Sequence, residues 1–277
     1  MAEVEERWEV DIGDYAALYR FSITDMEKFW QSVAHFAGII AQGWGETVLA
    51  DGGKMPGARW FPDARLNFAE NLLRRRDGAD AIVFWGEDEV RRRLSWAELT
   101  GEVSKLSQAF RAMGVGPGDR VAAFMPNMPE TMIAALASAS IGAVFSSCSP
   151  DFGSDGVLDR FGQIEPKVLF SADGYFFNGQ TYDSLERLAE IAARLPSVEK
   201  TVVVPYVGTQ PPLAGIAGGV TWRDFSRTFT AGEIAFTRLP FDHPLYILYT
   251  SGTTGEPKCI VHGAGGTLLQ HAKEHAL

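Results

Sequence analysis

Two periods of hydrophobic residues alternate along most of the chain, and they separate predicted strands from predicted helices. Short apolar runs predict strands at residues 81–85, 120–125, 143–146, 168–170, 201–204 and 245–248. Segments with apolar residues at helical spacing predict helices that begin near Ser95 and at residues 129–140, 155–163, 185–194 and 222–229. Strands and helices in this order predict an α/β fold, with a mostly parallel sheet flanked by helices on both faces.

Local signals support the start of this pattern. Residues 81–85 and 90–94 are joined by a short polar turn, which predicts a β-hairpin. Ser95 and Glu98 have the spacing of a capping box, so they predict the first turn of a long helix. Gly114 is suited to end that helix, because glycine adopts the left-handed conformation without strain.

Residues 1–75 have a different pattern and are expected to form an N-terminal extension to the α/β region at 76–277. Apolar residues share one face of a predicted helix in this extension: Met26, Phe29, Trp30, Val33 and Phe36. Ser22 or Thr24 is expected to cap the first turn of that helix. A Gly- and Pro-rich stretch follows, and a short helix is predicted at residues 67–73.

The segment with the clearest chemistry is residues 249–258, which read YTSGTTGEPK and follow the last predicted strand. Gly252 and Gly255 let the backbone approach a ligand closely, and backbone N–H groups in such a turn can surround phosphate oxygens. The common G-x4-G-K-S/T phosphate loop is absent here, because Lys258 is followed by Cys259. The alternative interpretation is an ordinary turn of Ser, Thr and Gly between two strands.

Composition narrows the class of protein. The 277 residues carry a net charge of −10, and this acidity argues against nucleic acid as a main partner. The longest nearly apolar stretch, residues 131–145, is too short to span a bilayer. The N-terminus has no apolar segment behind basic residues, so we expect no signal peptide and a cytoplasmic location. Cys148 and Cys259 lack metal-ligand spacing, and both are expected to be reduced and buried.

The 249–258 segment resembles the phosphate-binding signature of adenylate-forming enzymes, which include the acyl-CoA synthetases. Further resemblances extend along nearly the whole chain. Residues 58–73 are similar to the N-terminal signature of short-chain acyl-CoA synthetases, and residues 146–167 and 175–180 resemble the acetoacetyl-CoA synthetases in particular. The resemblance therefore implies the N-terminal part of the AMP-binding fold. Residues 1–75 are its N-terminal extension, and residues 76–277 are an incomplete first part of the AMP-binding domain.

The resemblance implies a two-step reaction. The carboxylate of acetoacetate attacks the α-phosphorus of ATP and forms an acyl-adenylate, whose carbonyl then accepts the thiol of coenzyme A. The implied phosphate-binding residues are Thr250, Ser251, Gly252, Thr253, Thr254, Gly255 and Lys258. Mg²⁺ is implied by the family, but the sequence assigns no metal ligand. The catalytic lysine and the C-terminal domain of the family have no counterpart in residues 1–277.

Two further sites are implied more weakly. Ser149, Pro150 and Asp151 match a region near the coenzyme A path. The alternative is that Asp151 or Ser154 caps the next helix. Relatives that activate acetate carry arginines near residues 174–180, where this chain has aromatic residues instead.

His262 and Gly265 match positions near the acyl and adenylate pocket, with a structural role as the alternative for the histidine. His271 and His275 are four residues apart, a spacing that zinc accepts, but we expect both on a solvated helix face.

Two other functions stay open. The chain is either the N-terminal part of an acetoacetate–CoA ligase or a catalytically inactive module that binds nucleotide, a partner protein or a complementing chain. A third possibility keeps the family but changes the acid to acetate or another short-chain acid. The acyl pocket is expected mostly beyond residue 277, so the sequence does not select the acid.

Overall fold

The computed structural model describes residues 1–87, 89–250 and 255–276. By its internal contacts the chain divides into two units, each described by itself below. Unit 1 comprises residues 1–71, 238–243 and 263–277, and unit 2 comprises residues 72–237 and 244–262. The predicted boundary at residues 75 and 76 is a division by ancestry and stays a prediction.

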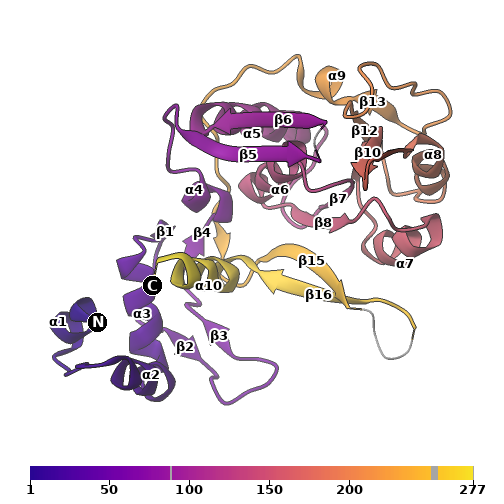
Figure 1. Ribbon diagram of the computed structural model, residues 1–277. Coiled ribbons are helices and arrows are strands. Elements are labelled where there is room, and N and C mark those ends of the chain that lie inside the picture. The colour runs from indigo at the N-terminus through magenta and orange to yellow at the C-terminus, as the bar shows by residue number, and fades with distance from the viewer. Residues whose placement is uncertain (88, 251–254, 277) are drawn as a thin grey trace. The chain divides into compact units, whose positions relative to one another are not determined.

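Unit 2 is built on a seven-stranded sheet with the order β13-β12-β9-β7-β8-β15-β16 (Figure 1). The strands are β7 (Arg120–Phe124), β8 (Val144–Cys148), β9 (Val168–Ala172), β12 (Lys200–Val204), β13 (Gly219–Thr221), β15 (Pro244–Thr250) and β16 (Lys258–Gly263). Every neighbouring pair from β13 to β15 is parallel. The predicted α/β fold with a mostly parallel sheet is therefore confirmed.

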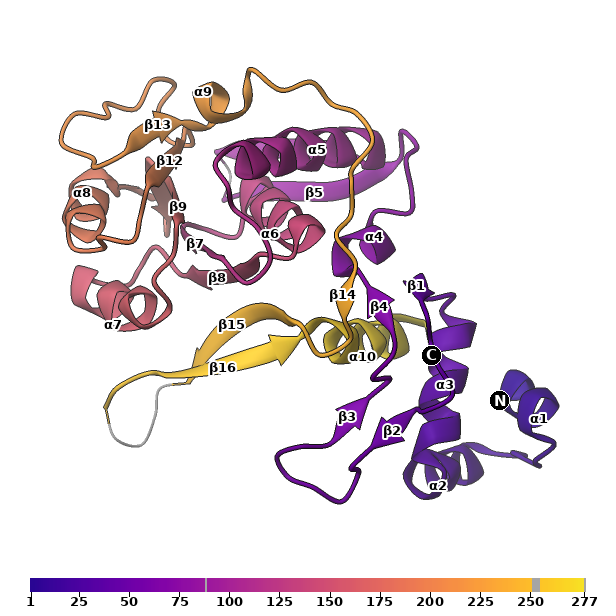
Figure 2. The same ribbon diagram turned by 180° about the vertical axis from the view of Figure 1, so that it is seen from behind.

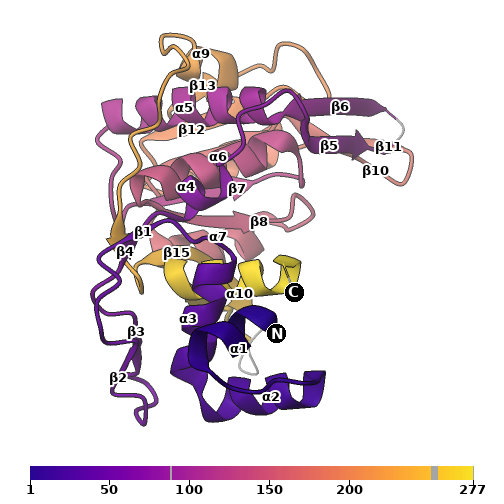
Figure 3. The same ribbon diagram turned by 90° about the vertical axis from the view of Figure 1, so that its left-hand side faces the viewer.

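Helices cover both faces of this sheet (Figure 3). They are α5 (Trp96–Ala112), α6 (Pro129–Ile141), α7 (Ser154–Ile164), α8 (Leu185–Ala193) and α9 (Trp222–Ser226). Successive residues of a strand point to opposite faces, and β9 shows the consequence. Leu169 packs into the cluster formed with α7 and α8, whereas the Phe170 ring meets Phe110 of α5 at 5.9 Å.

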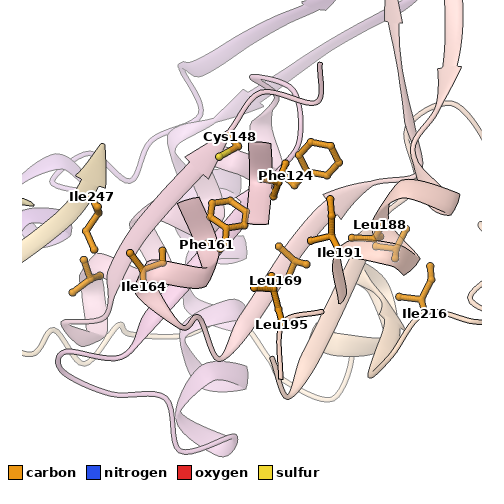
Figure 4. Packing of buried hydrophobic residues seen from close by; sticks show 14 residues of the cluster. Phe124, Cys148, Phe161, Ile164, Leu169, Leu188, Ile191, Leu195, Ile216 and Ile247 are labelled. Carbon is orange, nitrogen blue, oxygen red and sulfur yellow. The ribbon is translucent and has the colours of Figure 1, made fainter. Parts of the chain in front are cut away.

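The core on the α7 and α8 side is closely packed (Figure 4). Phe124 of β7, Phe161 of α7 and Leu188 of α8 are all buried in one cluster. Burying a large apolar side chain stabilises a fold by about 1.5–3 kcal/mol, so these residues fix α7 and α8 against the sheet. The sheet edge that carries the loops after β7 and β8 is held in place by this packing.

The hairpin and capping box predicted at the start of this region are confirmed. Strands β5 (Asp80–Gly86) and β6 (Val90–Ser95) pair antiparallel. Ser95 accepts a bond from the backbone N–H of Glu98, and the Glu98 carboxylate accepts one from the backbone N–H of Ser95. Gly114, with φ of 74°, follows the helix in the left-handed region, as expected.

A second hairpin was not predicted. Strands β10 (Gly174–Phe177) and β11 (Gln180–Asp183) pair antiparallel in a region where the sequence analysis predicted no strand. Asp173, just before β10, is 3% exposed and accepts backbone bonds from Tyr206, Val207 and Gly208 at 2.7 to 2.9 Å. These bonds tie the loop after β12 to the start of the hairpin.

Unit 1 contains three N-terminal helices and several very short strands. Its elements are α1 (Ala2–Trp8), α2 (Tyr15–Thr24), α3 (Met26–Phe36), β1 (Ala41–Gln42), β2 (Leu49–Ala50), β3 (Arg59–Trp60), β4 (Arg65–Leu66), α4 (Phe68–Leu72), β14 (Leu239–Pro240) and α10 (Ala264–Ala276). Strand β14 pairs with β4, which also pairs with β1. Residues far apart in the sequence therefore build one unit.

The predicted cap of α3 is wrong. Asp25 occupies the cap position, whereas Ser22 and Thr24 belong to the preceding helix α2. Their hydroxyls donate to the carbonyl oxygens of Tyr19 and Arg20, as serine and threonine do inside helices. The sequence analysis did not predict α2, so it assigned these hydroxyls to the wrong helix.

The apolar face predicted for α3 is partly confirmed. Phe29 and Val33 are buried against Phe21 and other residues of α1 and α2, and Trp30 packs beside them. Met26 and Phe36, at the two ends of the helix, are exposed instead.

Candidate functional site

Three parallel strands of unit 2 end at one edge of the sheet. The pairing of Phe124 with Cys148 aligns the ends of β7 and β8, and the pairing of Ser146 with Ile247 brings β15 into the same register. Ligands of parallel α/β sheets bind outside the carboxyl ends of the strands. The loops that follow β7, β8 and β15 are therefore the region where a site is expected.

A cleft of about 430 Å³ opens between the loops after β7 and β8 and the β10–β11 hairpin. It is lined by Met125, Pro126, Asn127, Thr131, Ser147, Cys148, Ser149, Pro150, Asp151, Tyr175, Phe176 and Phe177. The residues that the resemblance placed near coenzyme A, Ser149, Pro150 and Asp151, thus all line this cleft. The aromatic residues that stand where acetate-activating relatives carry arginines line the same cleft.

The loop after β8 is held by contacts that the sequence analysis did not identify. Arg187 of α8 donates to the carbonyl oxygens of Pro150 and Phe152 at 3.0 and 3.1 Å. Ser149 donates to the Asp151 carboxylate at 3.2 Å. The alternative in which Asp151 or Ser154 caps α7 is wrong, because the cap position is Gly153 and the helix start has no side-chain cap bond.

The aromatic wall of the cleft is an ordered stack. The rings of Tyr175 and Tyr182 lie 5.0 Å apart and nearly parallel, and Phe176 packs edge-on against Tyr206. Burial raises the pKa of Tyr175, the Asp151 carboxylate raises it further, and Arg187 acts in the opposite direction. Tyr175 therefore presents a neutral hydroxyl to the cleft at physiological pH.

Cys148 at the base of the cleft is a poor nucleophile. Burial raises the pKa of its thiol to about 12, although the charge of Arg160 opposes this shift. The thiolate is the reactive form of cysteine, so the thiol of Cys148 is chemically inert near neutral pH. Cys148 and Cys259 are both free cysteines in the structure. The expectation of burial holds for Cys148 only, because Cys259 lies half-exposed on the edge strand β16.

The predicted phosphate loop connects β15 to β16 (Figure 2). Ser251, Gly252, Thr253 and Thr254 lie outside the described residues. Of the remaining candidates, Thr250 is exposed at the end of β15, and Gly255 has φ of 95°, a value that favours glycine. Lys258 is exposed at the start of β16. Within residues 1–87, 89–250 and 255–276, no carboxylate lies at ion-pair distance from the ammonium group of Lys258.

Both stems of this loop contact α7. Tyr249 lies beside Arg160, and the Arg160 guanidinium is 5.8 Å from the centre of the Tyr249 ring. The Tyr249 hydroxyl accepts a hydrogen bond from Ser146 at 3.0 Å. Gln163 donates to the carbonyl oxygen of Pro257 at 2.9 Å, and Cys259 lies within 3.5 Å of the same side chain. Burial also raises the pKa of Tyr249, so its hydroxyl stays protonated.

The two candidates for the acyl and adenylate pocket fall in different units. His262 is half-buried on β16 in unit 2, four residues from Lys258, with its ring 5.0 Å from that of Tyr246. Gly265 is buried in the first turn of α10 in unit 1, where a side chain would overlap the ring of Phe241. Each position thus has a packing role, and the ligand roles stay predictions.

The described part of the chain offers no group of three or more His, Cys, Asp or Glu side chains that could hold a metal ion. Nor does any of its helices have the length and apolar character needed to cross a bilayer.

The sequence analysis missed Arg160, Gln163 and Arg187 as site residues. All three lie on predicted helices, and Arg160 and Gln163 share one face because they are three residues apart. Arg187 reaches Phe152 35 positions away, Arg160 reaches Tyr249 89 away and Gln163 reaches Pro257 94 away, so no local pattern pointed to these contacts.

Comparison with known proteins gives matches along the whole chain. The family model described as "AMP-binding enzyme" matches residues 68–276, and the model described as "Acetyl-coenzyme A synthetase N-terminus" matches residues 15–72. The "Acetoacetyl-coenzyme A synthetase" of Rhizobium meliloti (strain 1021) is 55% identical over 98% of this chain and 41% of its own length. The "Acetoacetyl-CoA synthetase" of Macaca fascicularis is 43% identical over 96% of this chain and 41% of its own length.

A solved structure and a more distant relative extend this result. The structure of "Acetoacetyl-CoA Synthetase from Streptomyces lividans" has a TM-score of 0.89 and 41% identity, over 96% of this chain and 40% of that one. The "Malonamoyl-CoA synthetase vrtB" of Penicillium aethiopicum is 38% identical over 100% of this chain and 40% of its own length. The chain therefore spans about two fifths of the length of the curated relatives it matches.

Proposed function

Because the chain belongs to the AMP-binding enzyme family, we propose that it is the N-terminal part of a ligase that joins acetoacetate to coenzyme A with cleavage of ATP. The observation that carries this proposal is the segment 249–258, which leaves the carboxyl end of a parallel strand in a chain 55% identical to a relative named acetoacetyl-coenzyme A synthetase. Acetoacetate, ATP and coenzyme A are then its small-molecule partners. A cytoplasmic location, without nucleic-acid or membrane partners, belongs to the same proposal.

The reaction proceeds in two displacements. A carboxylate oxygen of acetoacetate bonds to the α-phosphorus of ATP, and the bond from that phosphorus to the bridging oxygen breaks, which releases pyrophosphate. The sulfur of coenzyme A then bonds to the carbonyl carbon of the acyl-adenylate. The thiol loses its proton, and AMP leaves with the electrons of the cleaved anhydride bond.

The main task of this chain in the first step is to balance charge on the departing pyrophosphate. Positioned donors and cations supply most of the catalysis in phosphoryl chemistry. Lys258 is exposed where the loop returns to the sheet, so its ammonium group is available as a point charge for the β- and γ-phosphates. Thr250 and Gly255 are the first and last residues of the consecutive run of predicted phosphate contacts that precedes Lys258.

For the second step, the cleft beside Ser149, Pro150 and Asp151 is the part of unit 2 that we assign to coenzyme A. Tyr175, Phe176 and Phe177 offer ring faces there. Arg187 supplies a positive charge close to the same loop. The chain thus has a cation near the cleft despite the missing arginines, although it comes from α8 and not from residues 174–180.

Magnesium enters this proposal as the counter-ion of ATP and not as a resident metal. Mg²⁺ commonly binds substrate phosphates together with one or two carboxylates and several waters. The described residues hold no metal-binding group, so no step is assigned to a metal held by this chain.

The test is the exchange of labelled pyrophosphate into ATP by the native polypeptide that carries this sequence. The exchange is measured with and without each candidate carboxylic acid substrate. Its mass is first measured by immunoblot and intact mass spectrometry and compared with 30.3 kDa. Exchange that depends on acetoacetate supports the proposal. Exchange with acetate but not with acetoacetate would contradict the assigned acid.

A second candidate acid is favoured by one observation. The relative named malonamoyl-CoA synthetase is 38% identical along the whole of this chain, so the same N-terminal region occurs in a protein named for a different acid. Malonamate therefore belongs in the exchange assay beside acetoacetate and acetate. A native mass of 30.3 kDa with no exchange would favour an inactive nucleotide-binding or partner-binding module, or a half that needs a complementing chain.

A further inference from the structure

Helix α7 contacts three segments that approach the candidate site from different directions. Its first turn follows the loop 149–153, and its last two turns face both stems of the loop 250–258. Neither α7 nor any of its side chains was assigned a role in the site by the resemblance. The contacts at the two ends of α7 indicate that they serve one function, in which Arg160 and Gln163 take part.

Arg160 contacts the stem that enters the loop. Its guanidinium lies 4.3 Å from the ring centre of Phe152 and 5.8 Å from that of Tyr249, so one cation packs against an aromatic residue from each loop. A bond of 2.6 Å from Nη1 to the carbonyl oxygen of Gly156 fixes the direction of the side chain. Tyr249 is in turn bonded to the buried Ser146 of β8, which anchors this stem to the sheet.

Gln163 contacts the stem that leaves the loop, one turn further along the same face of α7. Its amide nitrogen donates to the carbonyl oxygen of Pro257 at 2.9 Å, while its amide oxygen lies 3.5 Å from the sulfur of Cys259. Lys258 is located between these two partners. The Gln163 side chain therefore contacts the residues on both sides of Lys258 and so holds the lysine backbone in place.

We propose that Arg160 and Gln163 are positioning residues that clamp the two stems of the 250–258 loop to α7 and so set the geometry in which the loop meets phosphate. Catalytic electrostatics depends on donors that are in place before the ligand arrives, because reorganising them would consume the binding energy. A sequence rich in Ser, Thr and Gly constrains its own backbone little, so it does not provide this order by itself. Two side chains three residues apart on a rigid helix provide it at low entropic cost. The functional half of this inference rests on the proposed ATP chemistry.

The experiment uses Gln163→Met, which keeps the length of the side chain and removes its bonds to Pro257 and Cys259, together with its bond to the carbonyl oxygen of Asp159 within α7. Gln108→Met is the matched control, because Gln108 of α5 donates to the carbonyl oxygen of Thr230 at 2.8 Å, a similar long-range contact away from the loop. The first readout is the rate at which a disulfide reagent labels Cys259. The buried Cys148 does not contribute in the native protein, so the signal reports on the exit stem alone.

The second readout is calorimetric affinity for MgATP and for inorganic pyrophosphate. Loss of one or two hydrogen bonds corresponds to a change of about three- to tenfold, so Gln163→Met is expected to speed labelling and weaken both affinities by such factors. Gln108→Met is expected to leave the rate and the affinities unchanged. An additional variant, Gln163→Glu, keeps the acceptor for Cys259 and loses the donor to Pro257, and it is expected to weaken affinity nearly as much.

Each result has a definite meaning. An unchanged labelling rate in Gln163→Met overturns the clamp, whatever the affinities. A faster rate with unchanged affinity overturns the positioning role. If the parent chain binds neither MgATP nor pyrophosphate, the proposed function fails for this chain, and the labelling rate alone then decides whether the clamp exists.

Discussion

Arg187 donates a hydrogen bond of 3.0 Å to the carbonyl oxygen of Pro150 and thereby ties the loop after β8 to helix α8, 37 residues further along the chain. The same nitrogen bonds the carbonyl oxygen of Phe152. A guanidinium that bonds two backbone carbonyls holds a loop in one conformation without requiring a carboxylate. Since that loop lines the cleft, the shape of the cleft depends on Arg187, which lies outside the sequence motif of the loop.

We predict that Arg187→Ala destabilises unit 2 by about 1–2 kcal/mol, because two charge-assisted bonds to backbone carbonyls are lost. Arg194, which follows the last turn of α8, is the matched control. Among the residues that the structure describes, it pairs only with Asp155 and Glu190, and all three side chains are at least half-exposed. Arg194→Ala is expected to cost much less than Arg187→Ala, because ion pairs between exposed side chains contribute little to stability. Urea unfolding followed by circular dichroism measures the free energy of unfolding of both variants. Equal losses of this free energy would contradict the stabilising role of the bonds between Arg187 and the loop.

Much of the sheet was predictable because its signals are local. The run 168–170 gave β9, and Ser95 with Glu98 gave the start of α5, since each depends on residues only a few positions apart. The sheet order and the pairing of β14 with β4 depend on contacts between distant segments, and no sequence period encodes them.

The candidate site was predictable only where a motif names its residues. The 249–258 segment and the loop at Ser149 carry family signatures, whereas Arg187 and Gln163 act through backbone carbonyls that any residue could supply. A partner of that kind leaves no mark in the sequence. The hairpin at 174–183 was missed for a different reason, because its four-residue strands are too short to show a clear period.

The buried thiol of Cys148 makes stability depend on pH. Its pKa is raised from 9.0 to about 12 in the folded chain, so between these values the unfolded chain has lost the proton and the folded chain keeps it. The unfolded state then binds fewer protons, and the free energy of unfolding falls as pH rises. The contribution is fully present below pH 9 and is lost progressively up to about pH 12.

We therefore predict that Cys148→Ala flattens the decline of the free energy of unfolding between pH 8.5 and 10.5, by up to about 1 kcal/mol per pH unit. Urea titrations at several pH values give this slope independently of any constant loss from the smaller side chain. Cys259→Ala is the control. Burial also raises the pKa of Cys259, but this side chain is less buried than Cys148. Removing the Cys259 thiol is therefore expected to change the slope of the unfolding free energy against pH less. Parallel curves for the parent and Cys148→Ala would refute the prediction.

Gly265 and Gly266 provide an adjacent pair for testing a packing role in α10. A Cβ atom at Gly265 would overlap the ring of Phe241, whereas one at Gly266 would meet nothing within 4 Å. Gly265→Ala is expected to destabilise unit 1 by about 1–3 kcal/mol through overpacking. Gly266→Ala is expected to be neutral or to stabilise by up to about 1 kcal/mol, because alanine favours the helix. Thermal unfolding distinguishes them, and a neutral Gly265→Ala would leave a ligand role as the better explanation of that glycine.

The last prediction concerns the charge of Lys258. Its side chain is exposed, so Lys258→Met is expected to leave unfolding nearly unchanged while weakening affinity for MgATP and pyrophosphate by about tenfold, the effect of one lost charge-assisted contact. The affinity of the variant is also expected to fall less steeply with salt than that of the parent, because one fewer charge is screened. Lys200→Met is the control, since Lys200 is equally exposed but begins β12, at the amino end of a strand in the same sheet. Equal weakening in both variants would show a general effect of net charge. A loss confined to Lys258→Met would place the phosphates at the carboxyl edge, where the parallel strands direct their loops.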